Sequence, residues 1–566
     1  MPALSGRHTI AGEPHMKAIR WYVAVVLVFG TGALVPLDAG ASDRVAQQGG
    51  RPAPGFDTPA AIEDPIPRTE DQPLLVVLAD FPDRPGLFTG QQWQTVFFGA
   101  GGFEDYFREV SYGQLRYAGD VVGLAEGNPI VNGSTVAYVR LPNPITYYAD
   151  GQYGFGDFPR DDGGVVYDAL AALDAADFDF TPYEDPATRR VENIVVVFAG
   201  SGYGYTEDPD NSLQATAFRL AQPFISSDGQ VFDNYTFCPD QQGNLTGQIA
   251  NVGICAHEHG HALGLPDLYD FSFTTTGDGR FDLMAFGLYG AGQGVRPFQP
   301  GAFSREFVGW VQATVAPVGV TSYTLDPSET TPDIIKLYPN GRPGDEYFLL
   351  ENRQALGFDQ DWEDIGLCEG LLIWHVDQAI VRDNPYTVNT LASAGGPQHQ
   401  GVVIVEADGR YDMTRSVNYG ECSDTWASGT WDAGTSPSSD LWSGEDSGLS
   451  VTVAPALGDV VNVTVGVTDT CTNPSKPLPV SPARGTRIGK SRPRLIWGTA
   501  ACTDSYVVTV RRDSKTGRVV DSAAGLTSRS YRTRTLARGR TYLWRVGACL
   551  VNACVYSRWW GFEVKA

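Results

Sequence analysis

The segment HEHGH, residues 257–261, holds the side chains best suited to do chemistry. His257 and His261 are four residues apart, so on a helix both imidazoles lie on one face and can bind one metal ion. Glu258 lies about 100° around the helix from His257, where its carboxylate can take a proton from water beside the metal. The pattern predicts a helix that carries a catalytic metal.

The residues after the second histidine can complete the site. Gly264 can take a left-handed conformation and end the helix, so that the chain turns and Asp267 returns as a third ligand. Three protein ligands leave a fourth position for water, which a catalytic zinc needs and a structural zinc does not. An ordinary solvated helix is the alternative for a bare H-E-x-x-H pattern. The extension H-x-x-G-x-x-D favours the metal site.

Two neighbouring side chains are expected to point away from the metal. His259 lies about 200° around the helix from His257, and Cys255 lies on the same back face. We therefore interpret His259 as a packing or surface residue and exclude Cys255 as a thiolate ligand.

Composition and the N-terminal pattern place the protein outside the cell. The 566 residues carry a formal net charge of −25, which suits a soluble secreted protein and argues against nucleic acid as the main ligand. Residues 1–41 have a signal-peptide pattern, with an apolar run over 21–37 and an alternative start at Met16. An uncleaved anchor is the alternative, but the run is short and contains glycines, so no stable membrane insertion is expected.

The eight cysteines fall into even groups, as expected for disulfides formed within domains of an exported chain. One group is Cys238 with Cys255, and a second is Cys368 with Cys422. The third group holds four cysteines whose connectivity the sequence leaves open: Cys471, Cys502, Cys549 and Cys554.

The order of apolar patterns predicts an α+β protease domain followed by two β-rich parts. Residues 42–71 are interpreted as a linker or short propeptide, 72–314 as the catalytic domain and 315–470 as a β-rich domain. Buried strands are expected at 74–79 and 194–198, and helices at 103–110 and 165–175.

Residues 471–566 differ from the rest in charge and pattern. They hold apolar and polar residues in alternation, which predicts a small β-sandwich similar to a fibronectin type III domain. From residue 472 on, this part has 18 of the 41 Lys and Arg residues but only 4 of the 66 Asp and Glu residues. Its basic charge suits an acidic surface or the acidic body of the protein itself; a solvated face is the equal alternative.

Several blocks together resemble the immune inhibitor A family of secreted bacterial zinc metalloproteases, in the metzincin-like group. Besides the metal motif HEHGHALGLPDLYD, these blocks are LLVVLADFPD, YFREVSYGQLRYAGDVVG, FDLMAFG, PGAFSREFVGW, EYFLLENR and GLLIWHVD. The resemblance covers residues 72–467 and implies a zincin-like (metzincin-type) fold in the catalytic domain. The C-terminal sandwich lies outside it.

The resemblance also implies roles for individual residues. His257, His261 and Asp267 would bind zinc, and Glu258 would act as general base and later as proton donor to the leaving amine. Met284 would form the hydrophobic Met-turn below the metal, a packing role in either interpretation. Some members of the group carry a Tyr two residues after this Met; here that position is Phe286, and the nearby Tyr289 is a weaker candidate.

Calcium is left open by the sequence. The place of the family's calcium loop, 184–190, contains Pro186, Arg189 and Arg190, and positive charge there opposes a hard cation. The other candidates are Asp161 with Asp162, and Glu207 with Asp208 and Asp210. A solvated acidic loop is the alternative for both.

His375 is the other histidine of interest. It lies on an apolar strand, where a hydrogen-bonded core histidine is the plain interpretation and a secondary catalytic or substrate-binding role is the alternative.

These patterns predict a secreted zinc endopeptidase that acts on extracellular proteins. We expect the substrate to lie extended along an edge strand before the metal helix, within 231–250. A secreted adhesin or matrix-binding protein with a vestigial protease fold is the alternative, motivated by the basic C-terminal part. The intact Glu258 argues against it.

Overall fold

The computed structural model describes residues 69–202, 208–243, 245–390, 399–455, 458–500, 502–551 and 553–566. The predicted signal peptide and nearly all of the predicted linker lie outside the described residues, as does Glu207. Among the helices of the described part, none has the length and apolar character needed to cross a bilayer.

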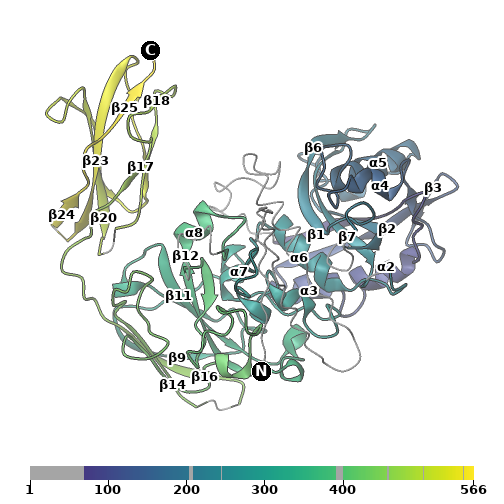
Figure 1. The fold of residues 1–566 in the computed structure, drawn as a ribbon, viewed down its shortest axis with the longest axis horizontal. Helices are drawn as coiled ribbons and strands as arrows, with labels where there is room; N and C mark the ends of the chain where they lie inside the picture. Colours follow the sequence, from purple (N-terminus) through teal and green to yellow (C-terminus); the bar gives the residue numbers. More distant parts are fainter. Residues whose placement is uncertain are drawn as a thin grey trace, which may run out of the picture.

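The N-terminal part is built around a mixed sheet in the order β3-β2-β1-β5-β7-β6, with β4 beside β1 (Figure 1). The neighbouring pairs β1/β2, β1/β5 and β5/β7 are parallel, and the flanking strands β3 and β6 are antiparallel to their neighbours. The strands are β1 (Glu70–Asp80), β2 (Leu115–Ala125), β3 (Asn128–Val131), β4 (Val139–Arg140), β5 (Ile194–Ser201), β6 (Thr216–Ile225) and β7 (Val231–Gln241). The apolar runs at 74–79 and 194–198 are the buried centres of β1 and β5, because layers of helices cover this sheet on both faces.

Helices pack on both faces of this sheet. Adjacent strand residues point to opposite faces. Thr236 of β7 contacts His259 of α6, whereas Tyr235 contacts Asp162 of α5. α5 and α6 therefore lie on opposite faces. The helices of this part are α2 (Gly90–Phe98), α3 (Phe103–Val110), α4 (Ile145–Ala149), α5 (Asp162–Ala175) and α6 (Val252–Ala262).

The edge strand differs from the sequence expectation. An edge within 231–250 is wrong, because β7 lies inside the sheet between β5 and β6. β6, over 216–225, is the strand at this edge. The error is one of strand order, which depends on long-range pairing rather than on local pattern.

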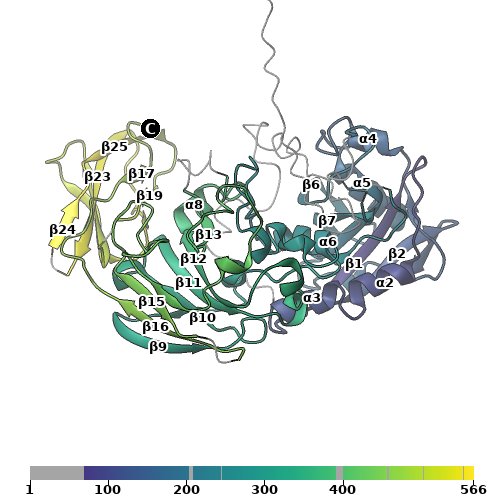
Figure 2. The ribbon, with the colours of Figure 1, turned by 60° about the horizontal axis from the view of Figure 1, so that its bottom comes forward.

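The middle part contains two packed sheets. A sheet in the order β13-β12-β11-β10-β8 packs on one in the order β14-β15-β16-β9. Figure 2 shows this part between the N-terminal sheet and the C-terminal strands. The strands are β8 (Thr314–Val315), β9 (Gly319–Leu325), β10 (Ile334–Leu337), β11 (Glu346–Arg353), β12 (Gly370–Asp377), β13 (Val402–Ile404), β14 (Gly429–Trp431), β15 (Leu449–Val453) and β16 (Val461–Val467). The helices are α7 (Ala302–Phe307) and α8 (Gln378–Asp383).

One hydrophobic core joins the N-terminal and middle parts. The sheet strands β11 and β12 are buried on both faces. Phe348 and Ile373 face the second sheet of the middle part, whereas Leu349 and Trp374 belong to the core that also contains the residues of β1 and β5. The apolar core thus continues across residue 314.

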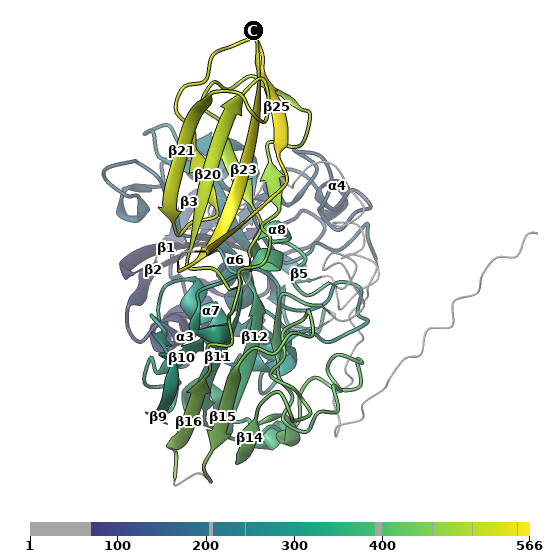
Figure 3. The same ribbon diagram turned by 90° about the vertical axis from the view of Figure 1, so that its left-hand side faces the viewer.

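The C-terminal strands form a separate core (Figure 3). A sheet in the order β17-β19-β22 and one in the order β18-β25-β23-β20-β21, with β24 beside β23, share buried residues that include Trp497, Val508 and Trp544. The strands are β17 (Pro479–Ser481), β18 (Arg487–Ile488), β19 (Arg494–Trp497), β20 (Ser505–Arg512), β21 (Val519–Leu526), β22 (Ser530–Arg532), β23 (Arg540–Leu550), β24 (Ala553–Tyr556) and β25 (Trp560–Val564). The likeness to a fibronectin type III domain stays a prediction.

All eight cysteines are paired within their predicted groups. The pairs are Cys238–Cys255, Cys368–Cys422, Cys471–Cys502 and Cys549–Cys554, which also resolves the connectivity that the sequence left open.

Candidate metal centre

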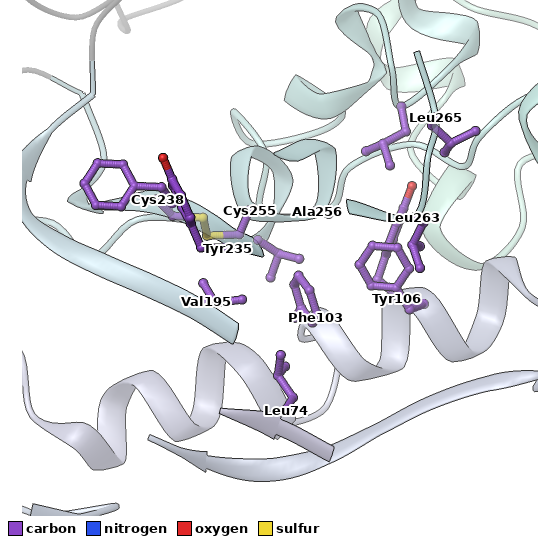
Figure 4. Close-up of a cluster of buried hydrophobic side chains, with 14 of the residues drawn as sticks. Leu74, Phe103, Tyr106, Val195, Tyr235, Cys238, Cys255, Ala256, Leu263 and Leu265 are labelled. Carbon is purple, nitrogen blue, oxygen red and sulfur yellow. A yellow bond between two sulfur atoms is a disulfide. The ribbon is translucent and has the colours of Figure 1, made fainter. Parts of the chain in front are cut away.

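Helix α6 is fixed to the sheet by its back face. The Cys255–Cys238 disulfide joins it to β7, and Figure 4 shows this bond next to Tyr235 and above Val195. His259 is buried; its ring lies 2.7 Å from the Tyr117 hydroxyl and 3.0 Å from that of Thr236. His259 is thus a packing residue that is fully engaged away from the candidate metal ligands.

The opposite face of α6 brings three potential ligands together. The Nε2 atoms of His257 and His261 each lie 3.2 Å from Oδ1 of Asp267. The chain reaches this position as the sequence predicted: α6 ends at Ala262, and Gly264 has φ +99°. The amide of Leu265 donates to the carbonyl of Gly260, which closes the turn before Asp267.

The donor atoms of this triad need a cation among them. Nδ1 of His257 faces the carbonyl oxygen of Leu283 at 3.0 Å, and Nδ1 of His261 faces that of Leu265 at 2.8 Å. A carbonyl only accepts, so each Nδ1 carries the ring proton and each Nε2 presents a lone pair. Each nitrogen lies 3.2 Å from the same carboxylate oxygen, so these atoms repel one another unless a proton or a metal ion lies among them.

The spacing of these atoms fits a metal ion. Ligands at about 2.0–2.1 Å from a tetrahedral ion are roughly 3.3–3.4 Å apart. Both nitrogen–oxygen distances are 3.2 Å, and Oδ1 of Asp267 is a buried atom to which no hydrogen-bond donor of the described residues is assigned. The triad therefore has the geometry and donor chemistry of a metal site.

The electrostatics of the triad are those of a site that takes up positive charge. Burial lowers the pKa of His261, but the carboxylates of Asp267 and Glu258 outweigh it and raise this pKa to about 9. Burial raises the pKa of Asp267, yet both histidines hold it well below its usual range. Without a metal the triad holds a proton, and a divalent ion must displace that proton to bind.

Glu258 lies beside the ligands without sharing their position. It is buried, and burial raises its pKa, while His257 and His261 oppose this rise. A carboxylate of raised pKa next to a metal site is suited to accept and return a proton.

Met284 supports the helix from below. It is fully buried, and a Cβ at Gly260 would lie 2.6 Å from its sulfur, so any larger residue at position 260 would force the Met284 side chain to shift. Its carbonyl accepts the amide of Leu268, which ties the turn to the segment that carries Asp267.

Two residues near the site were not singled out from the sequence. Asp282 is fully buried; its carboxylate accepts the amides of Met284 and Gly301, both at 2.7 Å, and so joins the Met284 turn to α7. Tyr269 lies with its ring 6.3 Å from that of His257, close to the charges of Asp267 and Glu258. Only its position two residues after Asp267 could have indicated it.

Of the remaining sequence candidates, Tyr289 lies near Tyr269 and stays a weaker candidate, whereas His375 lies in β12. Tyr289 ends the short helix Phe286–Tyr289, with its ring 6.5 Å from Phe286. His375 is buried in β12; it stacks between Phe348 and Trp442, and its Nε2 lies 2.9 Å from Oε1 of Glu346. These contacts favour the packing interpretation of His375.

The structure also places the calcium candidates. In the 184–190 loop, Glu184 forms an ion pair with Arg189, so a positive charge of the same loop already binds the Glu184 carboxylate. Asp161 caps α5 and Asp162 accepts from Thr216, and among the described residues no third acidic, His or Cys ligand lies close enough to complete a cation site with them. Neither is a freely solvated loop residue.

The comparisons with known proteins concern this region. Residues 225–317 match the family model described as immune inhibitor A peptidase M6, catalytic domain. The predicted resemblance is confirmed over this segment. This segment contains α6, the three candidate ligands and Met284, whereas the similar blocks at 74–83, 106–123, 346–353 and 370–377 lie outside it.

Individual relatives show the same likeness at lower coverage. The pre-pro-metalloprotease PrtV of Vibrio cholerae serotype O1 (strain M66-2) is 34% identical over 101 residues, which is 17% of this chain and 11% of that protein. Immune inhibitor A of Bacillus thuringiensis subsp. alesti is 24% identical over 223 residues, 31% of each protein. The chain thus spans less than a third of the length of these relatives.

Proposed function

We propose that the protein is a secreted zinc endopeptidase that hydrolyses peptide bonds in extracellular proteins. The observation that carries this proposal is the triangle of lone-pair atoms formed by His257, His261 and Asp267, with Glu258 beside it. The match to a peptidase catalytic domain over the same residues supports it. The topology of the N-terminal sheet supports a metzincin-type fold, and the four disulfides support an extracellular location.

Each residue has a defined part in the proposed reaction. Zinc held by the three ligands would supply the Lewis acidity that lowers the pKa of water and polarises the scissile carbonyl. Glu258 takes the proton of the attacking water and returns it to the leaving amine. The carbonyls that accept from both Nδ1 atoms hold the imidazoles in the tautomer that binds metal.

The substrate is proposed to lie along β6. This strand is the edge of the sheet next to α6, and an extended peptide can add to an exposed edge through main-chain hydrogen bonds. The exposure of residues 221–223 supports access to part of this strand.

The variant Glu258→Gln tests the mechanism. It should keep about one zinc per chain, because Glu258 is not a ligand, and lose casein hydrolysis by roughly 10²–10⁴-fold, because no base remains. Glu363→Gln, at an exposed position, is the control and should keep full activity. A Glu258→Gln protein that is folded and cleaves casein at the parental rate would show the mechanism to be wrong.

The alternative is a secreted adhesin with a vestigial protease fold, favoured only by the basic C-terminal part. Part of that basic charge already faces the body of the protein, since Arg529 pairs with Asp345. Zinc content together with a chelator-sensitive casein assay separates the two functions. An adhesin would show no activity that zinc restores.

A further inference from the structure

A second group of carboxylates lies in the middle part, away from the candidate zinc site. Glu406, Asp408 and Asp424 each bring one carboxylate oxygen to within 4.8 Å of the other two. Glu406 follows β13, and Asp424 ends the short helix Cys422–Asp424. The group is built from residues that are up to 18 positions apart in the chain, so it depends on the fold.

Two of the three carboxylates are buried, and one of their oxygens has no assigned donor, whereas the half-buried Asp408 accepts the amide of Arg410 and the hydroxyl of Ser423, both at 2.9 Å. Glu406 is 1% exposed and Asp424 is 0% exposed. Oδ2 of Asp424 accepts the amide of Glu421 at 2.7 Å, but Oδ1 is buried and no donor of the described residues is assigned to it. A buried carboxylate oxygen without a donor is costly unless a proton or a cation satisfies it.

The neighbouring positive charge does not balance this group. Arg410 contacts Asp408 at 3.4 Å and Glu421 at 3.5 Å, but its side chain is 63% exposed. Such an exposed pair contributes little to stability. Burial and the charge of Asp424 raise the pKa of Glu406 to about 7, and burial has the same effect on Asp424.

We propose that Glu406, Asp408 and Asp424 bind a structural calcium ion. All three donors are carboxylate oxygens, the ligands of a hard cation, and no sulfur or nitrogen donor belongs to the group. Calcium accepts irregular sets of six to eight oxygens at about 2.3–2.6 Å, whereas magnesium requires a near-ideal octahedron. An irregular loop that supplies three carboxylates is therefore suited to calcium, with water or main-chain oxygens as further ligands.

The ion would fix a loop that borders the zinc site. The carboxylate of Glu406 accepts the amides of Asp412 and Met413, which start the loop 411–421. From this loop the carbonyl of Tyr419 accepts the amide of Arg280, and the Tyr419 ring lies 4.4 Å from that of Phe286. Phe286 is two residues from Met284. Through the loop 411–421, calcium would therefore stabilise the turn that carries Met284.

The test measures calcium binding directly. The full-length Glu258→Gln protein, stripped of metal and reloaded with one equivalent of zinc, avoids autolysis. Isothermal titration with CaCl₂ should show a saturable site, and CaCl₂ should raise the thermal midpoint by several degrees. MgCl₂ serves as the second cation and should bind at least about tenfold more weakly.

Two variants in the same background assign the ion to this group. Asp424→Asn should weaken calcium binding at least about tenfold, because it removes the unpartnered oxygen's charge. Asp408→Asn, at a less buried position, should act the same way and covers the case in which Asp424→Asn does not fold. Asp364→Asn, an exposed residue of the same part, is the matched control and should bind as the parent does.

The outcomes are exclusive. A parent without calcium-dependent heat or stabilisation overturns the proposal. So does calcium binding of parental affinity in both Asp408→Asn and folded Asp424→Asn, because the ion would then lie elsewhere. None of these measurements requires proteolytic activity, so the result is independent of the proposed function.

Discussion

At the scale of single residues, the candidate metal site depends on backbone atoms as much as on side chains. The carbonyls of Leu283 and Leu265 orient both imidazoles. Outer contacts of this kind set the tautomer and basicity of metal-binding histidines. The sequence names the ligands, but it does not name these acceptors, because any residue type can supply a carbonyl.

The contact between Gly260 and Met284 gives a residue-scale prediction. Gly260→Ala places a Cβ 2.6 Å from the sulfur of a buried side chain and should destabilise the protein by about 1–3 kcal/mol. Met284→Ala should cost about 2–5 kcal/mol through the cavity it leaves. In the double variant the alanine methyl enters that cavity, so the combined loss should be smaller than the sum by about 0.5–3 kcal/mol.

Chemical denaturation of the zinc-loaded Glu258→Gln protein measures this cycle. Strictly additive losses would mean that Met284 does not press against the helix. Gly163→Ala, at a helical glycine of α5 whose added Cβ would make only ordinary contacts of 3.5–3.7 Å, controls for the backbone effect of replacing a helical glycine.

At the scale of elements, the N-terminus of α5 makes the stability of the folded protein depend on pH. Burial and the neighbouring Asp162 raise the pKa of Asp161 to about 7, although its carboxylate caps the helix by accepting the amide of Gly164. In the unfolded chain this pKa is about 3.9. The folded protein therefore binds more protons between these values, and its stability falls as the pH rises through this window.

Asp161→Asn tests this effect, since asparagine caps a helix as well as aspartate but carries no charge. The thermal midpoint of the variant minus that of the parent should be several degrees larger at about pH 8 than at about pH 5. Asp174→Asn, at the other end of α5, is the control variant. Equal differences at both pH values would show that the folded protein does not raise the pKa of Asp161.

The elements differ in how far the sequence predicts them. The metal helix and the strands around 74–79 and 194–198 follow from local pattern, and the turn at Gly264 follows from one residue type. The order of β6 and β7 does not, because it is set by pairing between distant strands. The roles of Asp282 and Glu406 were missed for the same reason: each carboxylate is defined by partners that only the fold brings near.

At the scale of the whole molecule, the C-terminal part is attached by polar contacts. Its core is separate, and Arg529–Asp345 and Arg342–Asp504 are the ion pairs that join it to the middle part. The apolar core of the C-terminal part contains no residue of the middle part among the described residues. The C-terminal part is thus expected to be separable.

A chain that ends at Thr470 tests this expectation. It should fold, bind zinc and cleave casein within about twofold of the full-length rate, because the proposed catalytic residues and their core remain intact. Casein turnover and the thermal midpoint measure both effects. If the truncated chain does not fold, the C-terminal part stabilises the rest of the protein by more than these polar contacts.

The continuous core across residue 314 has the opposite consequence for the rest of the chain. Leu349 and Trp374 of the middle part fill the same interior as β1 and β5 of the N-terminal sheet. If the chain is cleaved near residue 314, the two fragments should stay associated through this core. The N-terminal fragment produced alone would expose apolar residues to solvent and aggregate. The N-terminal and middle parts are therefore expected to fold and to carry the candidate metal site only as one unit, and a cut after β16 leaves their shared core intact.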